Sequence, residues 1–200
     1  MRIKLKCSFI IISIYVLIFL SYPNTGLGQE HDNSFVFRKI RWGMAKDEVI
    51  AGETLELIDT VKFETRITKS FGPDETAAYI GDAESKDVLI IYGFYGNCLT
   101  NAIQFFTEQY EDKSPYIEAY DLHKAELTER YGLPLESGDL WLDDGFYDNR
   151  ATDLDAGNLS LYSTWENSIT KVDLLLTKNI NTNKIIHMVF YGSKLIKREN

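Results

Sequence analysis

The sequence predicts an α+β domain: a mostly antiparallel β-sheet with one main amphipathic helix packed on it and a short N-terminal helix. Three observations predict this class: an apolar run that ends in a Gly-Asn turn signal, an amphipathic segment with start and stop signals, and alternating segments at the end of the chain. The chain has no Pro-rich linker and no long internal repeat. Residues 35–200 are therefore expected to form a single domain.

The first 28 residues have the pattern of a secretory signal peptide. Three basic residues precede an apolar run at residues 9–20, and Gly26 and Gly28 fit a cleavage site before Gln29. The alternative is an uncleaved anchor, but the run is shorter than the roughly 20 residues that a spanning helix needs. We expect an exported protein, periplasmic or extracellular, with a flexible polar tail at residues 29–34 and no stable membrane insertion after cleavage.

The net charge limits which partners are expected, and the cysteine content limits whether a disulfide can form. The chain has 21 basic and 30 acidic residues, and three of the basic residues lie in the leader, which leaves 18 against 30 and a net charge of −12. Such a surface repels nucleic acid and anionic lipid headgroups, so no nucleic-acid partner is expected. Cys98 is the one cysteine that remains after cleavage, so no intrachain disulfide can form, which is typical of a bacterial exported protein.

A short helix is expected after an N-terminal strand or extended arm at Phe35–Phe37. Trp42 precedes this helix as an apolar anchor and is expected to be buried. Asp47 and Glu48 would lie in the first turn, where carboxylates meet the positive end of the helix dipole. The residues expected to turn inward and to end the helix are Val49, Ile50 and Gly52.

A central hairpin is the clearest element. Val88–Tyr92 is nearly continuous apolar sequence, typical of a strand covered on both faces, and Gly96-Asn97 is a two-residue turn signal before a return strand at Leu99–Thr107. Weaker signals before the hairpin are a strand at Val61–Ile67, a turn at Phe71–Glu75 and a strand at Thr76–Ile80.

The main helix follows the hairpin. Ser114 is expected at its N-cap and Pro115 at its first position, while Gly132 forms the C-cap. The residues that share one face at helical spacing are Tyr116, Ile117, Tyr120, Leu127 and Tyr131.

Alternating residues predict strands around 159–165, 171–177 and 186–191, with a turn at Asn179–Asn183. A further short strand is expected at Asp139–Trp141. The segment Asp143–Gly157 is predicted to be a long polar loop.

This polar loop is the best candidate for a binding site. The proposed binding residues are Asp143, Asp144, Phe146, Tyr147 and Asp148. Five aspartates and an asparagine within residues 143–155 supply the oxygen ligands that calcium prefers, although their spacing does not match an EF-hand. The alternative is a solvated acidic loop, which we prefer, so no metal site and no cofactor are expected.

The sequence contains few residue combinations that are typical of an active site. The sequence lacks the usual nucleophile, phosphate-loop and metalloprotease motifs. His31, His123 and His187 are far apart in the chain, so no shared metal site is expected, and Cys98 has no neighbouring base to activate it. We therefore expect a non-enzymatic exported domain that binds a protein or cell-envelope component. The alternative is a carboxylate-dependent hydrolase of an envelope polymer that uses Asp144 with Asp148 or Glu166.

Residues Phe37–Val49 read FRKIRWGMAKDEV and resemble the opening of small exported bacterial proteins of uncharacterised function that share an F-x-x-I-x-W-G-M-S-K-x-E-V-like start. Tyr131–Pro134 and Ser163–Trp165 extend the resemblance, which implies export and a compact α+β domain and supplies no catalytic residue. Ala45 departs from the Ser or Thr that usually caps the helix in this pattern. Gly43–Val49 is also loosely similar to the helix start of small envelope-assembly lipoproteins.

Overall fold

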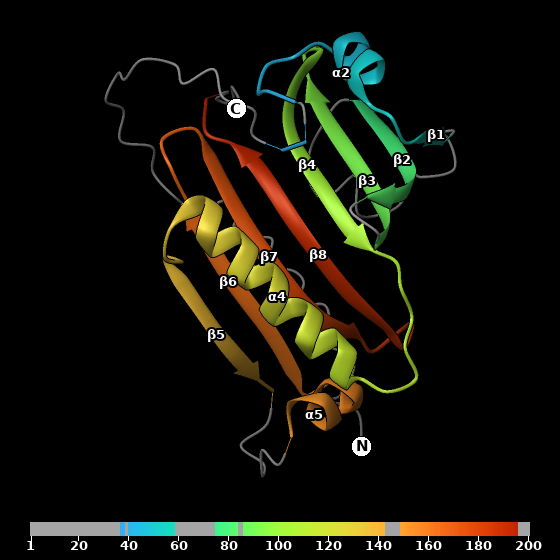
Figure 1. Cartoon of the computed structure of the whole chain (residues 1–200), viewed down its shortest axis with the longest axis vertical. Helices are drawn as coiled ribbons and strands as arrows, with labels where there is room; N and C mark the ends of the chain where they lie inside the picture. The colour runs from blue at the N-terminus through green and yellow to red at the C-terminus, as the bar shows by residue number, and fades with distance from the viewer. Residues whose placement is uncertain (1–36, 39, 59–74, 84–85, 143–148, 196–200) are drawn as a thin grey trace, which may run out of the picture. The chain divides into compact units, whose positions relative to one another are not determined.

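The computed structural model describes residues 37–38, 40–58, 75–83, 86–142 and 149–195 of the protein (Figure 1). The expected leader (1–28), the expected tail (29–34) and the strand expected at 61–67 lie outside these ranges. Within them, no helix is both long and apolar enough to cross a membrane. The helices and strands, labelled as in Figure 1, are α2 (Lys46–Gly52), β1 (Glu56–Ile58), β2 (Glu75–Ala83), β3 (Lys86–Tyr95), β4 (Cys98–Phe106), α4 (Ser114–Tyr131), β5 (Glu136–Trp141), α5 (Arg150–Ala156), β6 (Leu159–Glu166), β7 (Thr170–Asn179) and β8 (Lys184–Ser193).

The eight strands of the described residues form one sheet in the order β1-β2-β3-β4-β8-β7-β6-β5, and all neighbours are antiparallel. This confirms the predicted α+β class and the mostly antiparallel sheet. The order also contains a repeat. Within the described residues, each half has a helix followed by four strands that pair in chain order, α2 before β1–β4 and α4 before β5–β8, with α5 inserted between β5 and β6. The halves join where β4 pairs with β8. The sequence, which shows no long repeat, gave no sign of this repeated topology.

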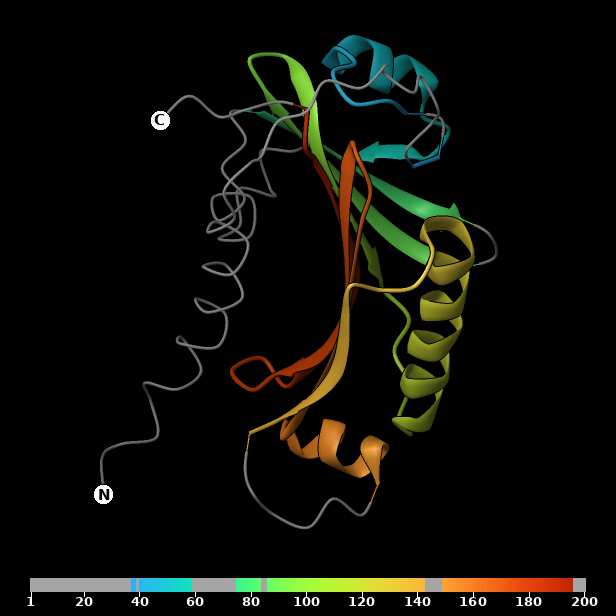
Figure 2. The ribbon, with the colours of Figure 1, turned by 90° about the vertical axis from the view of Figure 1, so that its left-hand side faces the viewer.

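The two faces of the sheet differ in what covers them. Figure 2 shows α4 on one side of the sheet. On that side, which we call the α4 face, the Tyr120 hydroxyl of α4 lies 2.8 Å from the Ser163 hydroxyl of β6. The predicted alternation in β7 and β8 is confirmed, because the paired Leu174 and Val189 are buried on the α4 face while Leu175 and its partner on β8 point the other way.

The central hairpin is confirmed. Gly96 and Asn97 both have positive φ, 55° and 62°, which matches the type I′ turn that joins twisted strands with least distortion. The predicted burial of β3 on both faces is also correct, because Tyr92 on one face and Ile91 on the other are both buried.

Helix α4 begins one residue earlier than expected. Ser114 is its first residue rather than its cap, and the Asp112 carboxylate accepts a hydrogen bond from the Ser114 backbone N–H at 3.0 Å. Gly132, with φ of 85°, ends the helix as predicted. The buried residues along its inner face are Tyr116, Tyr120, His123 and Leu127.

Helix α2 follows the prediction except on its outer side. Asp47 and Glu48 lie in the first turn, and Glu48 accepts a hydrogen bond from the Ala45 backbone N–H at 2.8 Å, which is the half of a capping box that Ala45 permits. Val49 is fully buried, but Ile50 is 37% exposed. The expectation that both turn inward is wrong, because adjacent residues point about 100° apart and this short helix buries one side.

Trp42 is only partly buried, so the prediction that it is buried is wrong. Its indole packs against the core and donates a hydrogen bond from Nε1 to the Thr170 hydroxyl at 2.8 Å. The buried aromatic of this segment is Phe37, which bridges to Ile40 across a tight turn.

The prediction of a polar loop at Asp143–Gly157 is wrong for its second half, because residues 150–156 form helix α5. The Asn149 side chain accepts a hydrogen bond from a backbone N–H of the first turn, and Gly157 ends the helix with φ of 78°. Leu154 is fully buried and anchors the helix to the core. These caps and this single apolar anchor outweigh the polar composition of the segment.

Candidate functional site

The binding residues expected from the sequence, Asp143, Asp144, Phe146, Tyr147 and Asp148, lie outside the described residues. Calcium binding by this segment therefore stays a hypothesis. The part of the segment that is described has its own partners: Asp155 pairs with Lys178, and Arg150 binds Asp139. No group of three metal-ligating side chains exists among the described residues.

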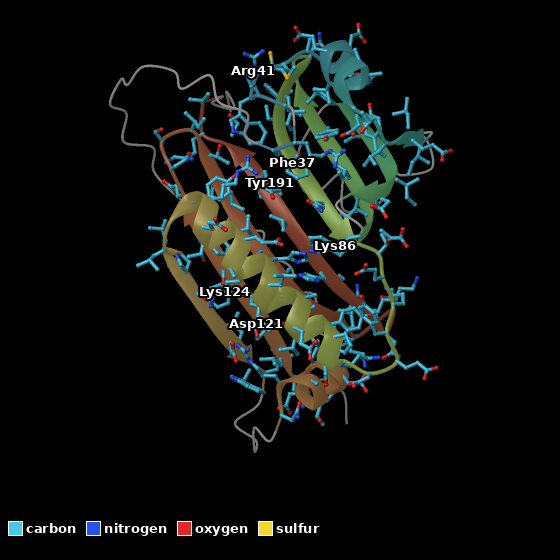
Figure 3. The ribbon with its side chains drawn as sticks, in the orientation of Figure 1. Phe37, Arg41, Lys86, Asp121, Lys124 and Tyr191 are labelled. Atoms are coloured by element: carbon cyan, nitrogen blue, oxygen red, sulfur yellow. The ribbon has the colours of Figure 1, made fainter. Side chains whose placement is uncertain are left out.

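A cavity of about 470 Å³ opens on the α4 face, where the two halves of the sheet meet. Strands β4 and β8 provide its floor, α4 one wall, and the N-terminal arm at Phe37 and Arg38 the other. Lys86, at the start of β3, closes one end. Figure 3 labels Phe37, Tyr191 and Lys86 around it. We call this cavity the seam cleft, and its size is typical of a small-ligand site.

The arm that forms one wall is held by two contacts. The Phe37 ring stacks on Tyr191 of β8, with ring centres 4.6 Å apart. Arg38 has a φ of 52°, a left-handed conformation that is unfavourable for a residue with a side chain. Its guanidinium makes a bidentate ion pair with Glu53, in which Nε donates at 3.2 Å and Nη2 at 2.9 Å, and this pair stabilises the strained turn.

Glu53 fixes the direction of Arg38. Its side chain is 3% exposed, and it also accepts hydrogen bonds from the Tyr92 hydroxyl and the Thr54 backbone N–H, both at 2.7 Å. Burial alone would raise the pKa of the carboxyl group, but the hydrogen bonds from Tyr92, Thr54 and Arg38 outweigh it and hold the pKa of Glu53 below its ordinary value. Glu53 is therefore ionised at neutral pH and keeps the arginine in one orientation.

A chain of three side chains links the end of the cleft to the sheet. The Lys86 ammonium donates to Nε2 of His123 at 2.7 Å, and Nδ1 of His123 lies 3.2 Å from Nε2 of His187. Because Nε2 of His123 accepts, its proton resides on Nδ1, which donates to His187. Burial, reinforced by Lys86, lowers the pKa of His123 to about 4. Burial, reinforced by His123 and Lys86, lowers the pKa of His187 to about 3, so both rings are neutral at neutral pH.

Three side chains of the cleft keep hydrogen-bonding capacity that no other described residue uses. Arg38 engages Glu53 through Nε and Nη2, which leaves Nη1 without a partner among the described residues. The Lys86 ammonium donates one N–H to His123. Its nitrogen lies 4.0 Å from a carboxylate oxygen of Glu126, which is beyond hydrogen-bond distance. The half-buried Gln104 amide on the floor makes no hydrogen bond within the described part of the chain. These groups are available to a ligand.

The described residues that line the cleft offer unused hydrogen-bond donors and few groups for acid–base chemistry. Among the described residues that line it, Glu126 is the one carboxylate, whereas glycoside hydrolysis requires two carboxyl groups about 5–10 Å apart. His123 is buried and its accepting nitrogen is occupied by Lys86, so it is not positioned to take a proton from a substrate.

Of the residues suggested for a hydrolase, the structure describes Glu166 alone. Glu166 belongs to β6, does not line the seam cleft, and pairs with Lys194. The other two suggested residues, Asp144 and Asp148, lie outside the described residues. Cys98 is a free, partly buried thiol at the start of β4 and also does not line the cleft.

The sequence did not reveal the seam cleft. His123 and His187 were expected to be separate, yet their rings lie 4.9 Å apart. One signal was visible: His123 follows Tyr116 and Tyr120 along the inner face of the helix, and His187 alternates with residues of the opposite face. Which helix face meets which strand depends on the pairing of β4 with β8, and local sequence does not specify that pairing.

No protein-family model, curated protein or solved structure matches the chain.

Proposed function

We propose that the chain is an exported, non-enzymatic domain that binds a protein or cell-envelope component at the seam cleft. The observation that carries this proposal is the convergence of unused donors from Arg38, Lys86 and Gln104 on one cavity with aromatic walls. Aromatic surface with a few placed polar groups is the usual composition of a ligand site.

Within this proposal, α4 is the main helix packed on the sheet and α2 is the short N-terminal helix. The contacts of Tyr120 with β6 and of His123 with β8 support this role for α4, which makes it one fixed wall of the cleft.

The proposal that the protein is exported rests on the basic residues at its start, the apolar run at residues 9–20 and the small residues before Gln29. Intact mass or N-terminal sequencing of material recovered outside the cytoplasm should give a chain that begins at or near Gln29. A recovered chain that retains its basic start would overturn cleavage.

Binding at the cleft is tested by filling it. Gln104→Trp places an indole over the cleft floor, and Gln109→Trp puts the same side chain at an exposed position that does not line the cleft. A component that co-purifies with the wild-type exported chain should be lost from the Gln104→Trp protein and retained by the Gln109→Trp protein. Equal retention by both folded variants would contradict binding at this site.

A further inference from the structure

We propose that His123 and His187 form a pH switch that holds α4 against the sheet while both rings are neutral and opens the seam cleft when they are protonated. This inference rests on the proposed function, because it names how the same binding site is regulated. A ligand held in the cleft at neutral pH is released on acidification.

The switch joins three elements of the fold. Lys86 begins β3, His123 belongs to α4 and His187 to β8. The Lys86 ammonium donates to Nε2 of His123 at 2.7 Å, and Nδ1 of His123 donates to Nε2 of His187 at 3.2 Å. The Phe106 ring of β4 lies against both imidazoles, with ring centres 4.0 Å from His123 and 4.6 Å from His187. The pair therefore lies where α4 meets the strands that join the two halves of the sheet.

Both hydrogen bonds require a neutral acceptor ring. A protonated imidazole carries N–H groups on both nitrogens and has no acceptor left. Protonation of His123 at Nε2 would place that N–H against the Lys86 ammonium across 2.7 Å. Protonation of His187 at Nε2 would place it against the N–H of His123 across 3.2 Å. Each contact would change from attraction to repulsion between two donors.

Burial makes these charges costly. The two residues are 5% and 3% exposed, and no ion pair joins either ring to a carboxylate among the described residues. The charged residues that face the pair are Lys86 of β3 and, one turn along α4 from His123, Glu126, which lies 4.0 Å from the Lys86 nitrogen. Strand β7 contributes the uncharged Leu176, which pairs with His187.

The rest of the cavity offers no second carboxylate among its described lining residues. Strand β4 contributes Gln104 and Phe106, and the arm and α4 contribute the cations Arg38 and Arg130. A buried cation without a partner is strongly unfavourable, so the fold must separate the rings before both can be charged.

The other side of α4 has a contact that acid does not break. The Tyr120 hydroxyl lies 2.8 Å from the Ser163 hydroxyl of β6, and burial raises the pKa of Tyr120, so both groups are neutral throughout the acid range. Acid therefore loosens α4 on the side of β8 and β3 alone. The helix moves away from β8 and takes Glu126 and Leu127 out of the cleft wall.

The size of the effect follows from proton binding. Burial lowers the pKa of His123 to about 4 and that of His187 to about 3, so the closed form takes up few protons at about pH 5. Rings exposed by opening have a pKa of about 6.5, so at about pH 5 protonation favours the open form by about thirtyfold for each ring and about a thousandfold for the pair. Above about pH 6.5 the switch is closed.

The test measures access to position 127, which lines the cleft from α4 and is 7% exposed. In the exported chain, Cys98→Ser removes the one thiol that remains after cleavage, and Leu127→Cys introduces another. The thiol reacts with dithiodipyridine in the folded chain and in the urea-unfolded chain at the same pH. The ratio of the unfolded rate to the folded rate is the protection of position 127.

Between about pH 7.5 and about pH 5, protection at position 127 should fall about a thousandfold with both histidines present. It should fall about thirtyfold with His187→Gln and less than about threefold with His123→Gln/His187→Gln. A fall below about tenfold with both histidines present, or equal falls with and without them, would overturn the proposal.

The matched control is Val49→Cys, a fully buried position in α2, in the other half of the repeat. At about pH 5 its thiol should stay at least about tenfold better protected than the thiol at position 127, because α4 opens while the rest of the fold stays closed. Equal protection at the two positions would show that acid unfolds the whole domain, and would overturn the switch.

The thiol measurement uses no ligand, so its result does not depend on the proposed function. Release is tested separately: the component that co-purifies with the exported chain should leave the wild type at a higher pH than the His123→Gln/His187→Gln protein. Release from both at the same pH would overturn control of the cleft by the histidines. A component retained by Gln104→Trp would instead overturn the proposed function, and the opening of α4 would stand on the thiol result.

Discussion

Acid should destabilise the fold through the buried pair His123 and His187. Burial is the main cause that lowers their pKa values, to about 4 and about 3. An unperturbed histidine in the unfolded chain has a pKa of about 6.5. As pH falls below that value, the unfolded state takes up protons that the folded state cannot accept. The stabilising contribution of the neutral pair is therefore complete above about pH 6.5 and is lost from there down to about pH 4 and pH 3.

The magnitude at about pH 5 follows from these values. That pH lies roughly 1.5 units below the unfolded pKa, and each unit is worth about 1.4 kcal/mol, so each histidine costs about 2 kcal/mol and the pair about 4 kcal/mol. Carboxyl groups whose pKa values in the folded state lie near or below the unfolded value of about 4 contribute little in this window. Burial raises the pKa of Asp173, which acts in the opposite direction, but this group is the same in the wild type and in a histidine variant. A loss of this size is a large share of the roughly 5–15 kcal/mol that stabilises a typical domain.

The assay is urea unfolding at about pH 7.5 and about pH 5. The wild-type free energy of unfolding should fall by about 4 kcal/mol between them, while the double variant His123→Gln/His187→Gln should lose less than about 1 kcal/mol. The reasoning is refuted if the wild type loses no more than the double variant. It is also refuted if the imidazole resonances of the two folded-state histidines titrate near pH 6.5.

Three single substitutions test other contacts by urea unfolding. Tyr92→Phe removes the hydroxyl donated to Glu53 at 2.7 Å and should lower the free energy of unfolding by about 1.5–3 kcal/mol, and an unchanged value would show that Glu53 does not depend on it. Leu154→Ala empties the buried anchor of α5 and should cost about 2–5 kcal/mol, whereas a negligible loss would mean that α5 does not pack as described. Trp42→Phe keeps most of the ring but loses the 2.8 Å hydrogen bond to Thr170, so a cost of about 1 kcal/mol is expected, and wild-type stability would contradict that contact.

The elements that local chemistry controls were predictable. The Gly96-Asn97 turn requires positive φ at both residues, which these two residue types tolerate best, so the hairpin followed directly from the sequence. The alternation in β7 was equally direct, because period-two burial leaves a visible pattern. Helix α5 was missed although Asn149 and Gly157 cap it, because the weight of its aspartates pointed to a loop.

The seam cleft could not be predicted from local sequence patterns. It requires β4 to pair with β8, whose central residues are more than eighty positions apart, and Phe37 to stack on Tyr191 from the far end of the chain. Neither Arg38 nor Lys86 differs in the sequence from an ordinary surface cation. Their roles depend on Glu53 and His123, which only the tertiary structure places beside them.

The most direct test of the central claim, that the seam cleft is the binding site, is photo-crosslinking from two positions on α4. Glu126 lines the cleft and Asp121 does not, yet their side chains are similarly exposed, at 52% and 54%. The two positions lie about 140° apart around the helix. With benzoylphenylalanine at each position in turn in the exported chain, we predict a crosslinked partner from position 126 and none from position 121. Crosslinking to the same partner with equal yield from both positions, or from position 121 alone, would contradict the account.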